Sequence, residues 1–172
     1  NFGDIHSYNR EQPIYKVAIS FDERDIDFVR KVVSDLMNKQ LMIYSLSEKL
    51  DNELTNHNFH SLFKCIKSKQ LPEEIDICLI FLTRNYFDSK LKNIKSECDL
   101  VQLCFSRKEN IFAIMYGPAI GPIDKFNLIP NSVQVSEMDL GKTIKIIERR
   151  IEISQVKFKH NNEIENILKR FN

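Results

Sequence analysis

The sequence predicts an α/β fold in which a parallel β-sheet lies between two layers of helices. Short β-favouring runs alternate along the chain with helical patterns. The run IDICLIFL at 75–82 is apolar at almost every position, as expected of a central strand buried on both faces. Strands that alternate with helices are joined by right-handed crossovers, and these place helices on both faces of the sheet.

The first half of the chain predicts two strands and two helices. Residues 15–21 (YKVAISF) form the first strand, and residues 41–46 (LMIYSL) form the second. Asp25 is the expected N-cap of the helix between them, because its carboxylate can accept from the amides of the first turn. After a polar stretch at 47–58, residues 59–69 (FHSLFKCIKSK) predict another helix. The stripe of the first helix consists of Val29, Val32, Val33, Leu36 and Met37.

The second half predicts three more strands and two more helices. Residues 75–82 are the third strand, and the helix after it covers 89–107, with Asp88 or Ser89 as its cap. NIFAIMYG (110–117) predicts a fourth strand and SVQV (132–135) a weaker fifth. A last long helix begins near Asp139, and its apolar stripe consists of Leu140, Ile144, Ile147 and Ile151.

These elements fit a flavodoxin-like three-layer sandwich with a five-stranded parallel sheet in the order 2-1-3-4-5. A chain of 172 residues has room for one domain with a single core. We expect an irregular segment over 1–13, the domain over 14–158 and a C-terminal helical extension over 159–172. Because the sequence begins with Asn1 rather than methionine, further domains of a longer parent chain are among the expected partners.

Composition argues against several functional classes. With 42% hydrophobic and 28% charged residues and a net charge of +1, neither disorder nor a nucleic-acid surface is indicated. No apolar run reaches the roughly 18 residues of a membrane span, and 1–13 is too polar for a secretory signal. We therefore expect a cytoplasmic protein with no membrane or nucleic-acid partner. The stretch 141–172 is basic, with eight Lys or Arg against four Glu. These basic residues form either a solvated face or a binding surface for an acidic partner.

Metal and glycine-loop sites are not indicated. His57 and His60 lie three residues apart without a third ligand nearby, so no metal site is expected. Only four glycines occur, and no glycine-rich phosphate loop is present in the sequence. The four cysteines form no CxxC pair and are expected as buried reduced thiols, at Cys65, Cys78, Cys98 and Cys104.

In the order 2-1-3-4-5, ligands bind beyond the carboxyl ends of the strands, where the first and third strands are neighbours. The residues expected there are the loops 21–25 and 83–89, together with Glu97 on the following helix. Glu97 falls within an apolar stripe that includes Ile94 and Val101. A carboxylate in such a stripe either reaches water or a nearby lysine, such as Lys92 or Lys95, or serves a site.

Two segments, VAISFDERDIDFV (17–29) and IDICLIFL…IFAIMYG (75–117), resemble the TIR (Toll/interleukin-1 receptor) domain, in its bacterial NAD-cleaving branch. The first resembles the opening strand and the acidic loop after it. The second resembles the later strand that ends in an S-x-N-Y-like motif, the helix with a glutamate, and the next strand. The resemblance covers about residues 14–155 and implies the same fold.

Many TIR domains cleave NAD and release nicotinamide, using the glutamate of that helix. By position, the resemblance implies Glu97 as the catalytic residue, NAD as the substrate and no separate cofactor. Cleavage develops positive charge on the ribose, which a nearby carboxylate stabilises. The pyridinium leaving group needs no proton, so one acid suffices. The resemblance also implies activation by self-association and a role in immune or antiviral defence signalling.

Five further residues are candidates for substrate binding. The ring of Phe21 could stack on a base, and Arg24 or Lys49 could meet the pyrophosphate. Tyr86 and Ser89 border the same edge. Each has a simpler interpretation, because a phenylalanine at a strand end is usually core and an exposed basic side chain is usually only solvated.

Two other functions fit parts of the sequence. Leu91 stands where TIR enzymes usually have tryptophan, and Glu97 lies eight residues after Ser89 rather than about six. Both departures favour a non-catalytic TIR adaptor that assembles signalling complexes. A phospho-accepting receiver would explain the acids after the first strand, Asp22 and Asp25 among them. It requires an aspartate at the end of the third strand, where the sequence reads Leu-Thr-Arg at 82–84, so this hypothesis is set aside.

Overall fold

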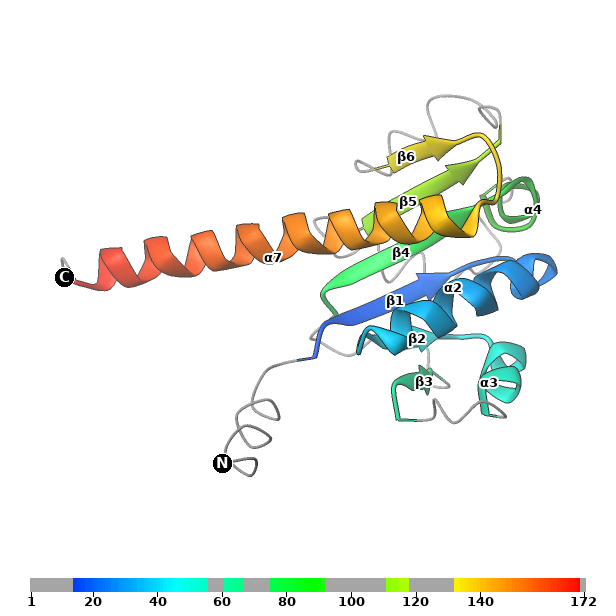
Figure 1. Cartoon of the computed structure of the whole chain (residues 1–172), viewed down its shortest axis with the longest axis horizontal. Helices are drawn as coiled ribbons and strands as arrows, with labels where there is room; N and C mark the ends of the chain where they lie inside the picture. The colour runs from blue at the N-terminus through cyan, green and yellow to red at the C-terminus, as the bar shows by residue number, and fades with distance from the viewer. Residues whose placement is uncertain (1–13, 56–60, 67–74, 92–110, 118–131, 171–172) are drawn as a thin grey trace. The chain divides into compact units, whose positions relative to one another are not determined.

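The structure is a computed structural model, and it describes residues 14–55, 61–66, 75–91, 111–117 and 132–170 (Figure 1). The chain divides into two compact units, Asn1–Met138 and Asp139–Asn172. The first unit contains the sheet and the second contains the long helix α7, Leu140–Arg170. The predicted segment 1–13 lies outside the described residues.

All six strands of the sheet run parallel, in the order β3-β2-β1-β4-β5-β6 (Figure 1). The chain builds the sheet outward from β1 to β3, then returns to the other side of β1 and builds outward again from β4 to β6. The predicted flavodoxin-like α/β fold is therefore confirmed. The strands are β1 Lys16–Ser20, β2 Met42–Ser45, β3 Phe63–Cys65, β4 Ile77–Leu82, β5 Ile111–Tyr116 and β6 Ser132–Val135.

The deepest part of the core surrounds β4, in which all six residues are buried. Its neighbours β1 and β5 are buried along most of their length, whereas the edge strand β6 is largely exposed. The register of β1 against β4 pairs Val17 with Ile77 and Ser20 with Ile80, so β4 continues to Leu82, past the end of β1. The loops that follow the two strands therefore leave the same edge of the sheet.

Helix α2, Ile26–Asn38, buries the apolar stripe that its sequence predicts. It ends at Lys39, after which Gln40 adopts a left-handed backbone with φ 64°, the conformation that commonly closes a helix. Helix α3, Glu48–Thr55, buries Leu50 and Leu54. An ion pair of 3.6 Å between Arg30 and Glu53 joins α2 to α3.

The predicted helix over 59–69 is wrong. Residues 63–65 form the edge strand β3, and the preceding polar stretch, predicted as a connection, contains α3 instead. The backbone amide of Ile43 donates to the carbonyl of Leu62 at 2.8 Å, and that of Ile66 donates to Ser45 at 2.7 Å. A three-residue strand is too short to show its own periodicity, so pairing with β2 decides its structure.

Two predicted helix caps are also wrong. Asp25 occupies the N-cap position of α2 but makes no capping bond through its side chain. The helix after β4 begins at Arg84 rather than near Ser89, and Thr83 caps it. It comprises α4, Arg84–Tyr86, and a π-helical turn η2, Phe87–Leu91. The rest of the predicted helix, up to 107, lies outside the described residues.

In the second unit, α7 is a single helix that continues past residue 158. Asp139 starts it, since its side chain accepts from the amide of Lys142 at 2.9 Å and its carbonyl accepts from Thr143 at 3.0 Å. None of the helices in the described part of the chain is both long and apolar enough to cross a membrane.

Candidate functional site at the carboxyl edge of β1 and β4

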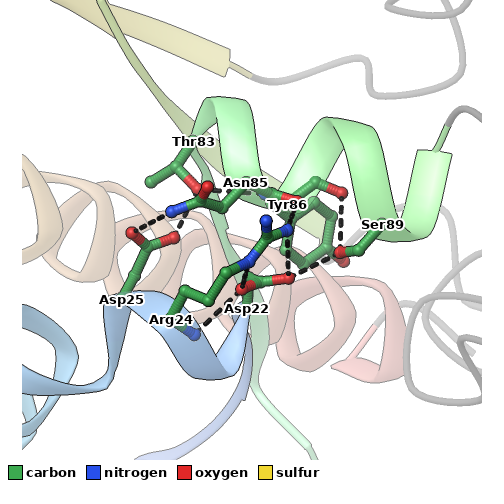
Figure 2. A network of polar contacts seen from close by, with 7 residues as sticks. All are labelled: Asp22, Arg24, Asp25, Thr83, Asn85, Tyr86 and Ser89. Carbon is green, nitrogen blue, oxygen red and sulfur yellow. Dashed lines mark hydrogen bonds and ion pairs between the residues drawn. The ribbon is translucent and has the colours of Figure 1, made fainter.

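The candidate site lies where the sheet reverses its direction of growth, beyond the carboxyl ends of β1 and β4. The loop after β1 and the turn of helix after β4 meet there through their polar side chains (Figure 2). Partners in these contacts are about sixty residues apart in sequence. We call this group the edge cluster; it consists of Asp22, Arg24, Asp25, Thr83, Asn85 and Ser89.

Asp22 organises the loop after β1. Its Oδ1 accepts from the backbone amide of Arg24 and from Nε of the same residue, each at 2.9 Å. Its Oδ2 accepts from Nη2 of Arg24 at 3.3 Å. The short helix η1, Glu23–Asp25, therefore starts at a carboxylate that also holds a guanidinium through both of its oxygens.

Thr83 organises the turn after β4. Its Oγ1 accepts from the amide of Tyr86 at 3.1 Å, and its carbonyl accepts from the amide of Phe87 at 3.0 Å. This turn brings Asn85 and Ser89 to the side that faces the β1 loop (Figure 2). Thr83 sets the geometry of this turn because its short hydroxyl side chain, directly after a buried strand, caps the helix that follows.

The two loops are joined by four hydrogen bonds. Thr83 Oγ1 donates to Oδ2 of Asp25 at 2.5 Å, and Asn85 Nδ2 donates to Oδ1 of the same carboxylate at 3.0 Å. Ser89 Oγ donates to Oδ2 of Asp22 at 2.6 Å. Nη2 of Arg24 donates to the carbonyl of Asn85 at 3.0 Å. Each aspartate of the β1 loop therefore receives donors from the β4 turn.

The ionisation of Asp22 reflects these contacts. The hydrogen bond from Arg24, assisted by the one from Ser89, lowers the pKa of Asp22 from 3.8 to about 2, although burial acts in the opposite direction. The same ion pair raises the pKa of the Arg24 guanidinium. The side chain of Asp22 is 9% exposed and that of Arg24 is 57% exposed. The pair thus presents a cation to solvent above a buried anion.

Beneath the cluster, Tyr86 links the helical turn after β4 to the end of β1. Its side chain is fully buried, and its hydroxyl shares a hydrogen bond of 2.8 Å with Oγ of Ser20 at the end of β1. A third loop joins the same edge, because Oγ of Ser47, after β2, donates to Oε1 of Glu23 at 2.7 Å. The carboxyl ends of β2, β1 and β4 are therefore linked by polar side chains.

The predicted substrate-binding residues fall into different environments. Arg24 and Ser89 belong to the edge cluster, as the sequence predicts for the two loops. Phe21 is only 4% exposed and Tyr86 is not exposed, so neither ring offers a face to a ligand in this structure, and both act as support beneath the edge. Lys49 is exposed in the first turn of α3, on another element than the edge cluster.

Glu97, the predicted catalytic residue, lies outside the described residues, as do Lys92 and Lys95. His57, His60, Cys98 and Cys104 lie outside them too. Cys78 is buried in β4, and Cys65 is partly buried in β3. Across the described ranges, no group of three or more histidine, cysteine or acidic side chains is arranged to hold a metal ion.

The sequence placed the loops 21–25 and 83–89 at the ligand-binding edge, but it gave no individual role in ligand binding to Asp22, Asp25, Thr83 or Asn85. All four follow closely on two strands that are neighbours in the parallel sheet. Their pairing could not be read from the sequence, since it depends on the register of the two strands.

Chemically, the edge cluster offers one exposed guanidinium, the Ser89 hydroxyl and two aspartates that already accept several hydrogen bonds. Both acids accept hydrogen bonds from neighbouring donors, and the low pKa of Asp22 makes it a weak base that is ionised at neutral pH. The arrangement therefore suits binding and loop positioning rather than proton transfer. Comparisons of the chain with protein-family models, curated proteins and solved structures find no match.

Proposed function

We propose that the chain binds NAD beyond the carboxyl ends of β1 and β4 and cleaves its nicotinamide–ribose bond, with Glu97 as the essential acid. The supporting observation is the edge cluster, in which charged and hydroxyl side chains gather at the reversal point of a doubly wound sheet. That is where such folds bind nucleotides. The proposed reaction, cleavage of the nicotinamide–ribose bond, is inferred from the resemblance of residues 17–29 and 75–117 to TIR domains.

Within this proposal, Arg24 contacts the pyrophosphate, since its guanidinium is more than half exposed and is held at a fixed position by Asp22 and Asn85. A guanidinium whose orientation is set in advance loses less entropy when it binds a ligand. A phosphate would have to compete with the carboxylate of Asp22, which already neutralises the Arg24 guanidinium. Phosphate binding must therefore share or displace the Arg24–Asp22 pair.

A second function, a non-catalytic TIR-type assembly module, is supported by the fact that Asp22 already binds the Arg24 guanidinium that a phosphate would need. The polar groups of the edge cluster bond to one another across the two loops, as expected where such contacts serve to hold a surface rigid. In that case the cluster fixes the loops against which another protein docks. The two proposals differ in whether nicotinamide is released.

The deciding experiment incubates the protein with NAD, dilute and then concentrated or crowded, and measures free nicotinamide. We expect release under the assembling conditions and its loss in Glu97→Gln, by at least about a hundredfold if the carboxylate stabilises the developing charge. Asp99→Asn, which neutralises an acid two positions further along, is the matched control and should retain activity.

The outcomes separate the proposals. Turnover that persists in Glu97→Gln would exclude Glu97 as the catalytic acid. If neither dilute nor assembled protein releases nicotinamide, the chain is an assembly module instead. Isothermal titration of the same samples with NAD would then show whether the edge cluster binds a nucleotide without cleaving it.

A further inference from the structure

The last two turns of α7 combine exposed apolar residues with ordered charges. Every residue from 163 to 170, with the sequence EIENILKR, is exposed. Three of them are large and apolar: Ile164 is 43% exposed, Ile167 is 51% and Leu168 is 60%. We call these eight residues the terminal segment of α7 (Figure 1). Large apolar side chains grouped on one surface are a common mark of an interface.

Helical geometry places these apolar residues on one stripe. At about 100° per residue, Ile164, Ile167 and Leu168 fall within an arc of about 100°. Charged residues flank this stripe on both sides. Glu163 and Arg170 lie along one side of it, and Glu165 lies along the other. Lys169 lies on the opposite face of the helix, about 150° from the middle of the stripe. On the first side the acid comes first and the base comes at the end of the helix.

We propose that the terminal segment of α7 pairs with the same segment of a second copy of this chain, in antiparallel orientation. In a two-fold antiparallel pair, each flank of one helix lies beside the same flank of its partner, running in the opposite direction. Glu163 of each copy then lies opposite Arg170 of the other, which gives two ion pairs. This pairing centres on Ile167 to within half a residue, so the apolar stripes overlap in the same alignment.

A parallel pair of the same stripes would be unfavourable. Parallel helices place opposite flanks side by side at the same height. Glu163 of each copy would then lie near Glu165 of the other. Like charges at these flanking positions repel, whereas the antiparallel pair gains two ion pairs. The charge order therefore selects a second copy as the occupant of this face and fixes its direction.

The predicted pair is weak, because an overlap of eight residues spans only about 12 Å of helix. Interfaces of this size are typically transient, so we expect a dissociation constant from about 10 µM to 1 mM. This inference does not depend on the proposed NAD cleavage, since the oligomeric state is measured without NAD.

Sedimentation equilibrium of the full chain tests the apolar stripe. The wild type should shift from monomer to dimer as its concentration rises through the expected range. Ile167→Asp should weaken this association at least tenfold. Asn166→Asp, which places the same charge on the opposite face of the helix, is the control and should associate as the wild type does. A wild type that stays monomeric up to about 1 mM overturns the proposal.

Charge exchange tests the direction. Glu163→Lys turns the two attractive pairs of the antiparallel arrangement into repulsive ones, so association should weaken about threefold to tenfold at low salt. Adding Arg170→Glu restores both pairs and should restore association. In a parallel pair, Glu163→Lys replaces a repulsive contact with Glu165 by an attractive one and should strengthen association. Association that is unchanged or stronger in Glu163→Lys therefore refutes the antiparallel arrangement.

Discussion

The edge cluster and the terminal segment of α7 use similar side chains in opposite ways. In the edge cluster, acids and their donors come from loops about sixty residues apart and bond to one another around a side chain that is 9% exposed. In the terminal segment, acids and bases lie within eight residues of each other, and all face solvent. The charges of the edge cluster therefore hold two loops of the fold together, whereas the charges of the terminal segment are available to a partner.

This difference has an energetic basis. A partly buried carboxylate with several donors has lost its hydration, and removing one of those donors is costly. An exposed ion pair contributes little, typically below about 1 kcal/mol. Changes in the edge cluster should therefore alter the free energy of unfolding. Changes in the terminal segment should alter association and leave that free energy nearly constant.

The largest effect is expected beneath the edge cluster. Tyr86→Ala removes a fully buried ring and should lower the free energy of unfolding by about 3–5 kcal/mol. Tyr86→Phe keeps the ring and removes only the hydroxyl that bonds to Ser20, so it should cost about 1 kcal/mol. Urea denaturation measures both values. A cost below about 1 kcal/mol for the alanine variant would show that the ring does not support this edge.

A smaller effect, which depends on pH, is expected at Asp22. Because its folded pKa of about 2 lies below the ordinary 3.8, it adds stability that is complete above about pH 5 and is lost as the pH falls through 4 towards 2. Asp22→Asn should cost about 1–2 kcal/mol at pH 7 and progressively less below pH 4.

The control for this titration is Asn52→Gln, a change at an exposed position of α3 that involves no titratable group. Its unfolding free energy should keep a constant offset from that of the wild type from pH 7 to pH 2. Thermal or urea unfolding at several pH values gives the two curves. A constant difference between Asp22→Asn and the wild type over that range would mean that the Arg24 pair does not set the ionisation of Asp22.

The smallest effect on stability is expected in the terminal segment. Leu168 is 60% exposed, so Leu168→Ala should change the free energy of unfolding at low protein concentration by no more than about 0.5 kcal/mol. The same variant should weaken self-association, which sedimentation at high concentration measures. A large loss of stability in dilute protein would place Leu168 in an intramolecular contact and remove the contrast between the two regions.

The sequence predicts strands best where burial leaves a strong pattern. The almost wholly apolar run at 75–82 and the runs at 15–21, 41–46, 110–117 and 132–135 all contain the observed strands. Strand β3 was missed because its three residues carry no pattern of their own. The predicted capping bond of Asp25 is wrong for a different reason. Its carboxylate could accept from the local backbone, but donors from Thr83 and Asn85 take it instead.

For the candidate site, the sequence predicted the two loops and, among its residues, Arg24 and Ser89. For the rings of Phe21 and Tyr86 it left both a binding role and a simpler structural one open, because a strand end can direct a side chain either way, and the structure buries both rings. The role of Glu97 stays a prediction that rests on the resemblance and on the chemistry of the leaving group.

The sequence by itself determined the α/β class and the buried stripe of Ile144, Ile147 and Ile151 on the last helix, since both follow from periodicity within single elements. Only the tertiary structure decided which polar side chains meet. Hydrogen bonds between Asp25 and Thr83 or between Asp22 and Ser89 join positions 58 and 67 residues apart. Such contacts depend on the register of two parallel strands, a property that neither strand carries alone.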